Sequence, residues 1–351
     1  MQSSRERVRT ILRGDTPDRP ALYDLIRNDA IVAHFAGEPA TEENGREVVF
    51  RAYAPAIDAT RPLIRTPNRD RTETLPDGRE RRYSRWTIWT SPLRFATADD
   101  YVAEKKRLLD AWDAAWTPAR QAALDAKLAE HADEQQRLGD VYRFLVGPCE
   151  WIEGLYHEVG LDQFVYFLAD YPDLIEQLVE MNARETILWA EHLPADREID
   201  AVFLADDLAY RNGSIFNPRW LDRVYMPRLA RIVEAFHRRK MKVLFHSDGN
   251  LWRILDALVS AGIDALNPIE VMAGMDVGEI HRRYPRLLLA GGIDVSDLLV
   301  FGTPEAVRET VRRTIDAAEG RIMVGSSTEL HDAVPLGNFL AMRDAVLEYR
   351  S

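Results

Sequence analysis

The chain has 351 residues, of which 46% are hydrophobic and 29% charged, and its formal net charge is −12. This is the composition of a globular protein that is large enough to bury a core without disulfide bonds. A single cysteine, Cys149, excludes an internal disulfide and a multi-thiolate metal site. Since no run of Lys and Arg stands out, the sequence argues against nucleic-acid binding.

The amino-terminal residues 1–13 are charged and lack an apolar stretch. No window of the chain approaches the roughly 18 uninterrupted apolar residues of a membrane span. We therefore expect neither a signal peptide nor a membrane segment, and a cytoplasmic protein.

In chain order, residues 3–12 are predicted to form a helix that a turn-rich segment, 14–20, terminates. A first strand is predicted at 21–25. Residues 48–54 and 56–64 continue this part of the chain, where Pro55 and Pro62 limit any helix.

Two inserts follow. The stretches 72–75 and 82–89 flank Pro76-Asp77-Gly78-Arg79, and alternation around an Asp-Gly turn predicts a hairpin insert at about 70–90. Residues 97–131 are rich in Ala, Leu, Lys and Glu, and predict a helical insert.

From residue 141 onward, short apolar runs alternate with amphipathic stretches. The predicted strands are 141–146, 201–205, 242–246, 265–267, 287–290 and 321–324. The predicted helices between and after them are 172–192, 218–238, 250–261, 276–284, 304–318 and 336–349. This alternation predicts a parallel sheet covered by helices, and its length favours one (β/α)8 TIM-barrel domain over 1–351. An open, doubly wound sheet is the alternative.

Polar side chains follow the predicted strands, and in a parallel barrel the active site lies where strands end. These residues are Asp24, Arg27, Glu150, Asp206, Asp207, His246, Asp248, Asn267, Glu270, Glu329 and His331. They predict a site around His246 and Asp248 to which several strands contribute.

Each of these residues also has a purely structural interpretation. Asp248 or Asn250 could cap the helix that follows, and Asp206 and Asp207 could be solvated loop residues. His246 could be a hydrogen-bonded core histidine. The interpretation as a site is favoured because two carboxylates directly after a buried strand are costly unless they bind something.

Two further residues are candidates for substrate contact. Tyr210 follows the aspartate pair and could reach over the barrel mouth. Arg27 could hold a substrate carboxylate, because a guanidinium pairs with a carboxylate in a bidentate manner. A surface arginine is the alternative.

Several segments together resemble the uroporphyrinogen-decarboxylase superfamily. They are Gly14-Asp15-Thr16-Pro17-Asp18-Arg19-Pro20, Asp206-Asp207-Leu208-Ala209, Ile215-Phe216-Asn217-Pro218, His246-Ser247-Asp248-Gly249-Asn250, Gly262-Ile263-Asp264-Ala265-Leu266-Asn267-Pro268, Gly291-Gly292-Ile293-Asp294, and Val334-Pro335 with Asn338. The resemblance covers most of the chain and is strongest from about residue 141. It implies a (β/α)8 barrel and either of two activities, porphyrinogen decarboxylation or zinc-dependent, corrinoid-linked methyl transfer.

The sequence departs from the motifs of both branches, and these departures help to choose between the two activities. The Arg-Gln-Ala-Gly-Arg stretch of the decarboxylases is absent, and the comparable residues read Tyr23-Asp24-Leu25-Ile26-Arg27-Asn28-Asp29. The His-x-Cys of the methyltransferases is here His246-Ser247-Asp248. Because zinc accepts imidazole and carboxylate ligands, the resemblance implies a zinc or other divalent-metal site at His246, Asp248 and Glu150.

The main hypothesis is a metal-assisted enzyme that moves a methyl group from a small oxygen-bearing substrate to a corrinoid held by a partner protein. His246, Asp248, Asp206 and His331 are its predicted catalytic residues, and Arg27, Asp24, Arg65, Tyr210 and Asn267 its predicted substrate-binding residues. Alternatives are a decarboxylase of a carboxylated ring compound, with Arg27 and Arg65 as clamps, an acid–base pair without metal, and a binding barrel without chemistry. By analogy with the decarboxylases, we also expect a homodimer.

Overall fold

The computed structural model describes residues 2–194 and 199–349. Its central feature is a curled, seven-stranded parallel sheet in the order β1-β15-β14-β13-β12-β9-β8. These strands are β1 (Ala21–Leu22), β8 (Leu145–Val146), β9 (Ala201–Ala205), β12 (Lys242–His246), β13 (Ala265–Asn267), β14 (Leu288–Ile293) and β15 (Ile322–Ser326). The predicted mixed α/β fold with a parallel sheet is confirmed.

A further strand pair lies between the two ends of this sheet. Strand β3 (Ala59–Thr60) pairs in parallel with β7 (Tyr142–Arg143), which runs on into β8, and Tyr23 after β1 bridges to Ala59. The Asp24 N–H donates to the Ala59 carbonyl at 3.1 Å, and the Asp58 N–H donates to the Leu22 carbonyl at 2.8 Å.

The strand residues divide into two packing layers because side chains alternate along a strand. Inward-facing residues form one apolar cluster, and every one of the strands named above contributes to it or packs against it; examples are Tyr23, Ala59, Phe144, Phe203 and Leu244. Outward-facing neighbours such as Val202 and Phe245 belong to the larger core under the helices. This alternation fixes which side chains point toward the centre at the strand ends.

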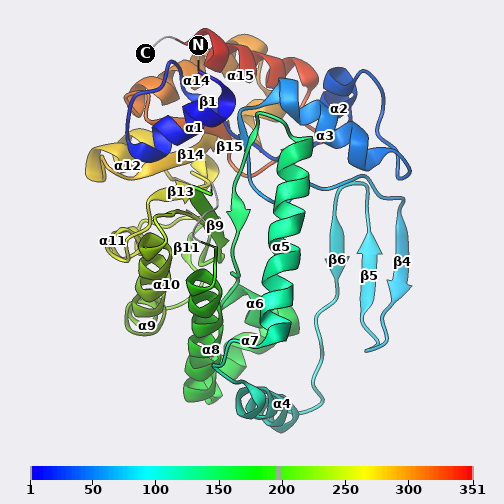
Figure 1. The fold of residues 1–351 in the computed structure, drawn as a ribbon, viewed down its shortest axis with the longest axis vertical. Coiled ribbons are helices and arrows are strands. Elements are labelled where there is room, and N and C mark those ends of the chain that lie inside the picture. The colour runs from blue at the N-terminus through cyan, green and yellow to red at the C-terminus, as the bar shows by residue number, and fades with distance from the viewer. Residues whose placement is uncertain (1, 195–198, 350–351) are drawn as a thin grey trace.

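Helices cover the outside of the sheet, as Figure 1 shows. They are α1 (Ser4–Arg13), α2 (Asp29–Ala36), α3 (Gly45–Ala56), α4 (Ala98–Ala111), α5 (Pro118–Arg137), α6 (Glu153–Val159), α7 (Leu161–Asp170), α8 (Pro172–Glu191), α9 (Pro218–Trp220), α10 (Met226–Arg238), α11 (Leu255–Ser260), α12 (Val277–Arg283), α13 (Leu298–Phe301), α14 (Pro304–Ala317) and α15 (Leu336–Glu348). A π-helical turn, η1 (Leu221–Tyr225), joins α9 to α10, and a 3-10 turn, η2 (Val271–Ala273), follows β13.

Several predicted boundaries need correction. The helix predicted at 97–131 is two helices, α4 and α5, because α4 ends before Trp112 and Thr117 caps a new start with Pro118 at its first position. Pro55 is not excluded from a helix but lies in the last turn of α3. The first predicted strand is shorter, and Ile26–Arg27 form β2, which pairs with β16 (Leu330–His331).

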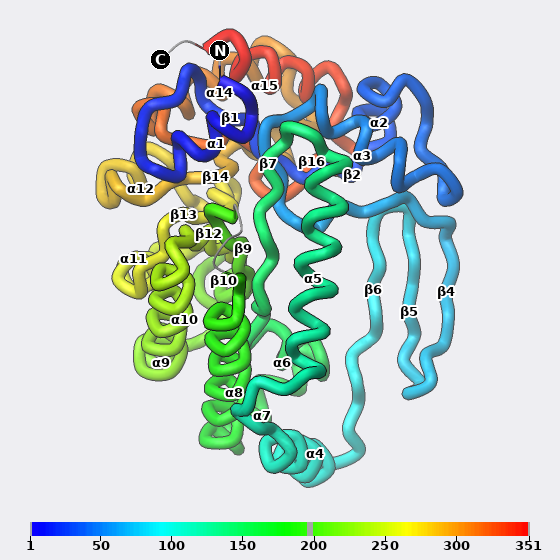
Figure 2. Tube along the Cα trace, viewed as in Figure 1, coloured from blue at the N-terminus to red at the C-terminus, as the bar shows by residue number. Residues whose placement is uncertain are grey.

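An antiparallel sheet projects beside the main body between α3 and α4, as the chain trace in Figure 2 shows. It consists of β4 (Arg71–Thr74), β5 (Glu80–Tyr83) and β6 (Ile88–Thr90), where Thr74 pairs with Glu80 across the predicted Asp-Gly turn. The residues of this sheet are exposed or half-buried on both faces. A short antiparallel pair, β10 (Ala209–Tyr210) and β11 (Gly213–Ser214), follows β9.

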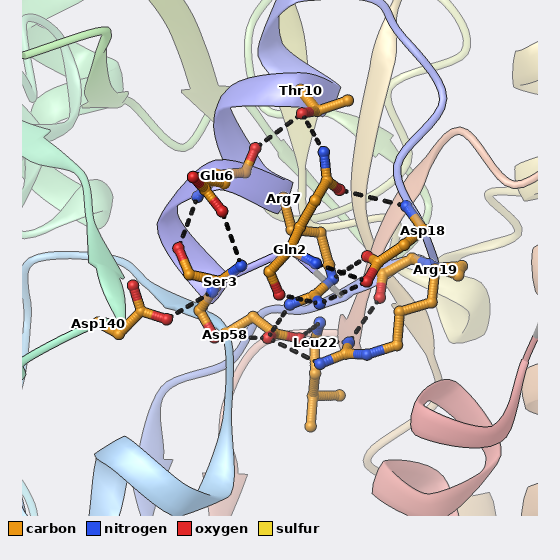
Figure 3. Close-up of polar contacts among 12 residues, drawn as sticks. Gln2, Ser3, Glu6, Arg7, Thr10, Asp18, Arg19, Leu22, Asp58 and Asp140 are labelled. Atoms are coloured by element: carbon orange, nitrogen blue, oxygen red, sulfur yellow. Dashed lines mark hydrogen bonds and ion pairs between the residues drawn. The ribbon is translucent and has the colours of Figure 1, made fainter.

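A network of buried ion pairs lies where the strands begin (Figure 3). Asp58 accepts from Arg7 Nη1 at 2.8 Å and from Arg19 Nη1 at 2.7 Å, and it also accepts from the Leu22 N–H and the Ser4 hydroxyl. Asp18 binds the other edge of Arg7 through Nε at 2.9 Å. Arg7 and Asp58 are each only 3% exposed, so every charge buried here has an opposite charge against it. We call Arg7, Asp18, Arg19 and Asp58 the base network.

Candidate metal centre

His246, Asp207 and Asp248 converge at the opposite end of the strands. His246 is the last residue of β12, and its Nε2 lies 3.7 Å from Asp248 Oδ1 and 3.9 Å from Asp207 Oδ1. One ligand atom from each of the three side chains lies within 4.8 Å of the others. The imidazole and the carboxylate of the His-Ser-Asp segment therefore face the same space, as the hypothesis from the sequence requires.

Strand alternation explains this convergence. Phe203 and Leu244 point into the inner cluster and Ala205 packs against it, so the next positions of the same parity, Asp207 and His246, also face inward. Asp248 follows by the same rule. The loop turns directly afterwards at Gly249, whose φ of 93° and close approach to the backbone of Tyr210 leave no room for a β-carbon.

The tautomer of His246 is set by its neighbour Asn267 at the end of β13. Asn267 Nδ2 donates to the Ala290 carbonyl at 3.1 Å, which turns Oδ1 toward His246 Nδ1 at 2.7 Å. Because Oδ1 can only accept, Nδ1 carries the hydrogen and Nε2 presents its lone pair to the two aspartates. Burial, together with the charge of Arg61, lowers the pKa of His246 to about 4, so the ring is neutral at physiological pH.

The carboxylates of Asp207 and Asp248 form no ion pair with a Lys or Arg among the described residues. Asp207 accepts the Asp248 N–H at 2.8 Å, whereas Asp248 Oδ1 is buried and has no hydrogen-bond partner within residues 2–194 and 199–349. Burial raises the pKa of both carboxyls. An unpaired buried carboxylate oxygen beside an imidazole lone pair is the donor set of a divalent cation, and two carboxylates with one histidine match the three protein ligands of a catalytic zinc.

A buried acidic group lies behind Asp207. Glu153 Oε2 accepts the Asp207 N–H at 2.8 Å, and burial, reinforced by the charge of Asp207, raises the pKa of Glu153 to about 9. Glu270 accepts the Gly249 N–H at 2.6 Å and so fixes the loop that carries Asp248. Neither residue was predicted to be catalytic or to bind metal.

Asp206, rather than Asp207, was predicted to be the catalytic aspartate of its pair. Asp206 is fully buried and accepts the N–H groups of Ile152 and Glu153 at 3.1 and 2.7 Å, at the amino-terminal end of α6. It therefore points away from His246 and caps a helix. The side-chain alternation of β9 is the signal that could have selected Asp207.

The structure does not bring Glu150 and His331 into the three-residue group. Glu150 is exposed and has a positive φ of 64°. His331 lies on β16, and its Nδ1 accepts the Ala333 N–H at 3.3 Å within its own turn. Asn250 does not cap the following helix, because α11 begins at Leu255.

The predicted substrate-binding residues lie in different surroundings. Arg27 pairs with Glu329 at 2.7 Å, and burial lowers its pKa, as do the charges of Arg61 and Arg65. Asp24 is 2% exposed and accepts from Ser326 and Leu25, and burial raises its pKa to about 7. Tyr210 is 53% exposed. Asn267, as described, contacts His246 instead of standing free for a substrate.

Comparison with known proteins identifies the family. The family model for uroporphyrinogen decarboxylase (URO-D) matches residues 141–349, more than half of the chain. The chain belongs to the URO-D family. The matched region includes the three residues of the candidate metal centre and none of the four residues of the base network.

One curated relative of this URO-D family chain is the methylcobamide:CoM methyltransferase MtbA of Methanosarcina mazei. The two are 22% identical over 206 residues, which are 59% of this chain and 57% of the relative's length. The match thus spans little more than half of the relative.

Among solved structures, a methyltransferase from Methanosarcina mazei superposes with a TM-score of 0.65 over 99% of both chains, at 17% identity. This likeness supports the fold. A B12-independent methionine synthase from a Shewanella species reaches a TM-score of 0.45 at 12% identity. No helix among the described residues is long and apolar enough to cross a membrane.

Proposed function

We propose that this URO-D family chain is a metal-dependent methyl-transfer enzyme, and that Asp207, His246 and Asp248 hold its divalent ion, with zinc the first candidate. Its methyl group passes from a small oxygen-bearing substrate to a corrinoid that a partner protein carries. The observation that carries the proposal is Asp248 Oδ1, buried without a partner and 3.7 Å from the free Nε2 of His246.

The architecture around the site supports this proposal. The parallel pairings run from β8 through β9 to β15 and β1, and the Tyr23–Ala59 bridge with the β3–β7 pair joins the two ends. We take these contacts to close an eight-stranded barrel of the kind the sequence predicts. The three ligands then lie at the carboxyl ends of the strands, where barrel enzymes place their active sites.

The protein's own groups have distinct tasks at this site. Asn267 holds the imidazole in the Nδ1–H tautomer, and a fixed hydrogen bond to a ligating histidine is a common second support for a metal site. Glu153 accepts the backbone N–H of Asp207 and so holds that residue in place. Glu270 accepts the N–H of Gly249 and so fixes the loop next to Asp248. When bound, a divalent ion here would polarise a substrate oxygen or lower the pKa of a substrate hydroxyl or thiol.

Metal analysis tests the ligand set. Purified protein is equilibrated with zinc, dialysed, and analysed for metal per chain. We expect one ion per chain in the wild type and a loss of affinity of at least about 100-fold in Asp207→Asn and His246→Gln, because each removes one of three ligands. Glu150→Gln and His331→Gln are the matched controls, and both should retain the ion.

Retention of metal by Asp207→Asn, or its loss in Glu150→Gln, would reject the proposed ligands. The reaction is then tested with cobalamin in its reduced cobalt(I) form as methyl acceptor and with methanol or a small methyl ether as donor, following the cobalt absorbance. Methyl transfer that depends on the ion and is lost in His246→Gln supports the proposal. Carbon dioxide release from a carboxylated substrate without methyl transfer would instead favour a decarboxylase.

A further inference from the structure

Arg61 is a buried cation beside the candidate metal centre that sequence reasoning did not single out. It follows β3, two positions after the inward-facing Ala59, so its side chain also points toward the centre. It is 5% exposed, and its Nη1 lies 3.3 Å from Nδ1 of His246. Arg61 and the two aspartates thus lie on opposite sides of one imidazole ring.

The side-chain contacts of the Arg61 guanidinium are long, at 3.3 Å to His246 and 3.5 Å to Glu329. The contact with His246 is not a good hydrogen bond, because Nδ1 already directs its hydrogen to Asn267 at 2.7 Å and a guanidinium cannot accept. The closest carboxylate is Glu329, with Oε2 3.5 Å from Nη2. Arg61 Nε is buried and has no hydrogen-bond partner in the described part of the chain. A guanidinium in this state is costly unless something else binds it.

The neighbouring side chains do not supply Arg61 with a carboxylate of its own. Glu329 already binds Arg27 Nη1 through Oε2 at 2.7 Å, so two guanidiniums share one carboxylate. Arg27 Nε is also buried without a partner. Asp24 uses both of its oxygens on Ser326 and Leu25 and forms no ion pair with Arg61 among the described residues. Arg27 and Arg61 therefore share one directly paired carboxylate, and the further carboxylates of Asp24 and Asp248 act on Arg61 only through space.

We propose that Arg61 anchors the substrate through an oxyanion, a carboxylate or a sulfonate, which hydrogen-bonds its guanidinium. Arg27 supplies a second cation on the same side. The anion site at Arg61 does not depend on the proposed function. Only the placement of the substrate's reacting end, next to Asp207 and Asp248 on the other side of the His246 ring, rests on it. The substrate class is therefore a short anionic compound, in which about the width of an imidazole ring separates the charged end from the reacting end.

The test uses the Nε–H signal of Arg61 as its probe. Protein labelled with nitrogen-15 at arginine is titrated with acetate and with acetamide, and likewise with methanesulfonate and methanesulfonamide. The signal is assigned by its absence in Arg61→Lys. We expect a saturable shift with at least one anion and binding of its neutral amide at least about tenfold weaker, because hydrogen bonds to charged groups are the stronger ones. The stronger-binding anion identifies the class.

Variants complete the test through the ligand's own methyl signal. Arg61→Met should weaken anion binding at least about tenfold, whereas Arg94→Met, which removes an exposed arginine paired with Asp162, should leave it unchanged. If Arg61→Met does not fold, the comparison of anion with amide in the wild type decides. Shifts that fail to saturate, or that are equal for anion and amide, overturn the inference.

Chelation separates this inference from the proposed function. Anion binding that persists after removal of the metal supports the subsite, whereas binding that disappears with the metal would place the anion on the ion and overturn it. Because Arg61 is not a proposed ligand, Arg61→Met should still bind one ion per chain. Metal binding without anion preference would leave the proposed function standing and reject only the subsite.

Discussion

At the start of the strands, Asp58 lies within 2.8 Å of both Arg7 and Arg19, whereas at their end Asp207 and Asp248 face a neutral histidine, and no Lys or Arg among the described residues lies within 4.0 Å of either. Both regions bury carboxylates, but only the first pairs them with cations. Removal of one partner from the base network should therefore be costly for folding, whereas the candidate metal centre keeps unpaired charge that a ligand can use. Four predictions test this contrast.

The largest effect is expected in the base network. Asp58→Asn removes the shared carboxylate, so Arg19 loses its ion pair and Arg7 keeps only its pair with Asp18. The free energy of unfolding should therefore fall by about 3–5 kcal/mol. Urea denaturation of the metal-free protein measures it. Asp140→Asn, which alters an exposed carboxylate that accepts the Ser4 N–H, is the control and should cost under about 1 kcal/mol. Equal costs would remove the distinction between paired and exposed charge.

The second effect concerns the support of the metal ligands. Asn267→Leu deletes the acceptor that fixes the His246 tautomer, so zinc affinity should fall about 10- to 100-fold. Asn338→Leu is the matched control, because Asn338 is also buried and donates to the Leu299 and Gly302 carbonyls away from the site. It should lose stability but keep its zinc affinity. A similar loss of affinity in both variants would mean that general loosening, and not the tautomer, is responsible.

A smaller effect of opposite sign is expected at the metal centre. In metal-free protein, Asp248→Asn removes one of two neighbouring carboxylates and should raise the free energy of unfolding by about 0.5–1 kcal/mol. The gain is small because the Asp248 side chain is 39% exposed and its charge is partly screened. With zinc present the sign should reverse, because the variant lacks a ligand. Destabilisation of the metal-free variant would contradict the view that this carboxylate is kept for binding.

The last effect is a difference in the pH dependence of stability. Burial raises the pKa of Asp58, but hydrogen bonds from Arg19 and its neighbours outweigh it, and the pKa stays below the usual 3.8. Its contribution is thus present above pH 3.8 and is lost as the pH falls through the lower folded value. Asp24, with its pKa raised by burial to about 7, behaves oppositely and costs stability as the pH rises from about 4 to 7.

The stabilities of Asp58→Asn and Asp24→Asn, each relative to wild type, should therefore change differently with pH. The destabilisation by Asp58→Asn should shrink at acid pH, whereas Asp24→Asn should compare more favourably with wild type at pH 8 than at pH 5. Parallel curves for the two variants would show that Asp24 is paired as well as Asp58 is. Circular dichroism during urea titration at each pH is sufficient to measure both.

Much of the fold follows from local patterns. Three strands were predicted at their observed bounds, Ala201–Ala205, Lys242–His246 and Ala265–Asn267, because each is a short apolar run ended by a polar residue. Asp276 and Thr303 cap α12 and α14 as their positions before helices suggest. The break between α4 and α5 has a local signal, the Thr117 cap with Pro118 after it, which the helical composition of residues 97–131 obscured. The strand at Ile26 depends on its pairing with β16, and the sequence pattern did not predict it.

What the sequence determined by itself is the rhythm of strands and helices and the gathering of polar residues at strand ends, because both depend on spacing along the chain. The tertiary structure decided which polar residues meet. Asp206 and Asp207 are adjacent and chemically identical, but side chains alternate along the strand. Asp206 therefore caps helix α6, whereas Asp207 points toward His246. Arg61 meets His246 only because the strands curl around a common centre, and that proximity has no trace in local sequence.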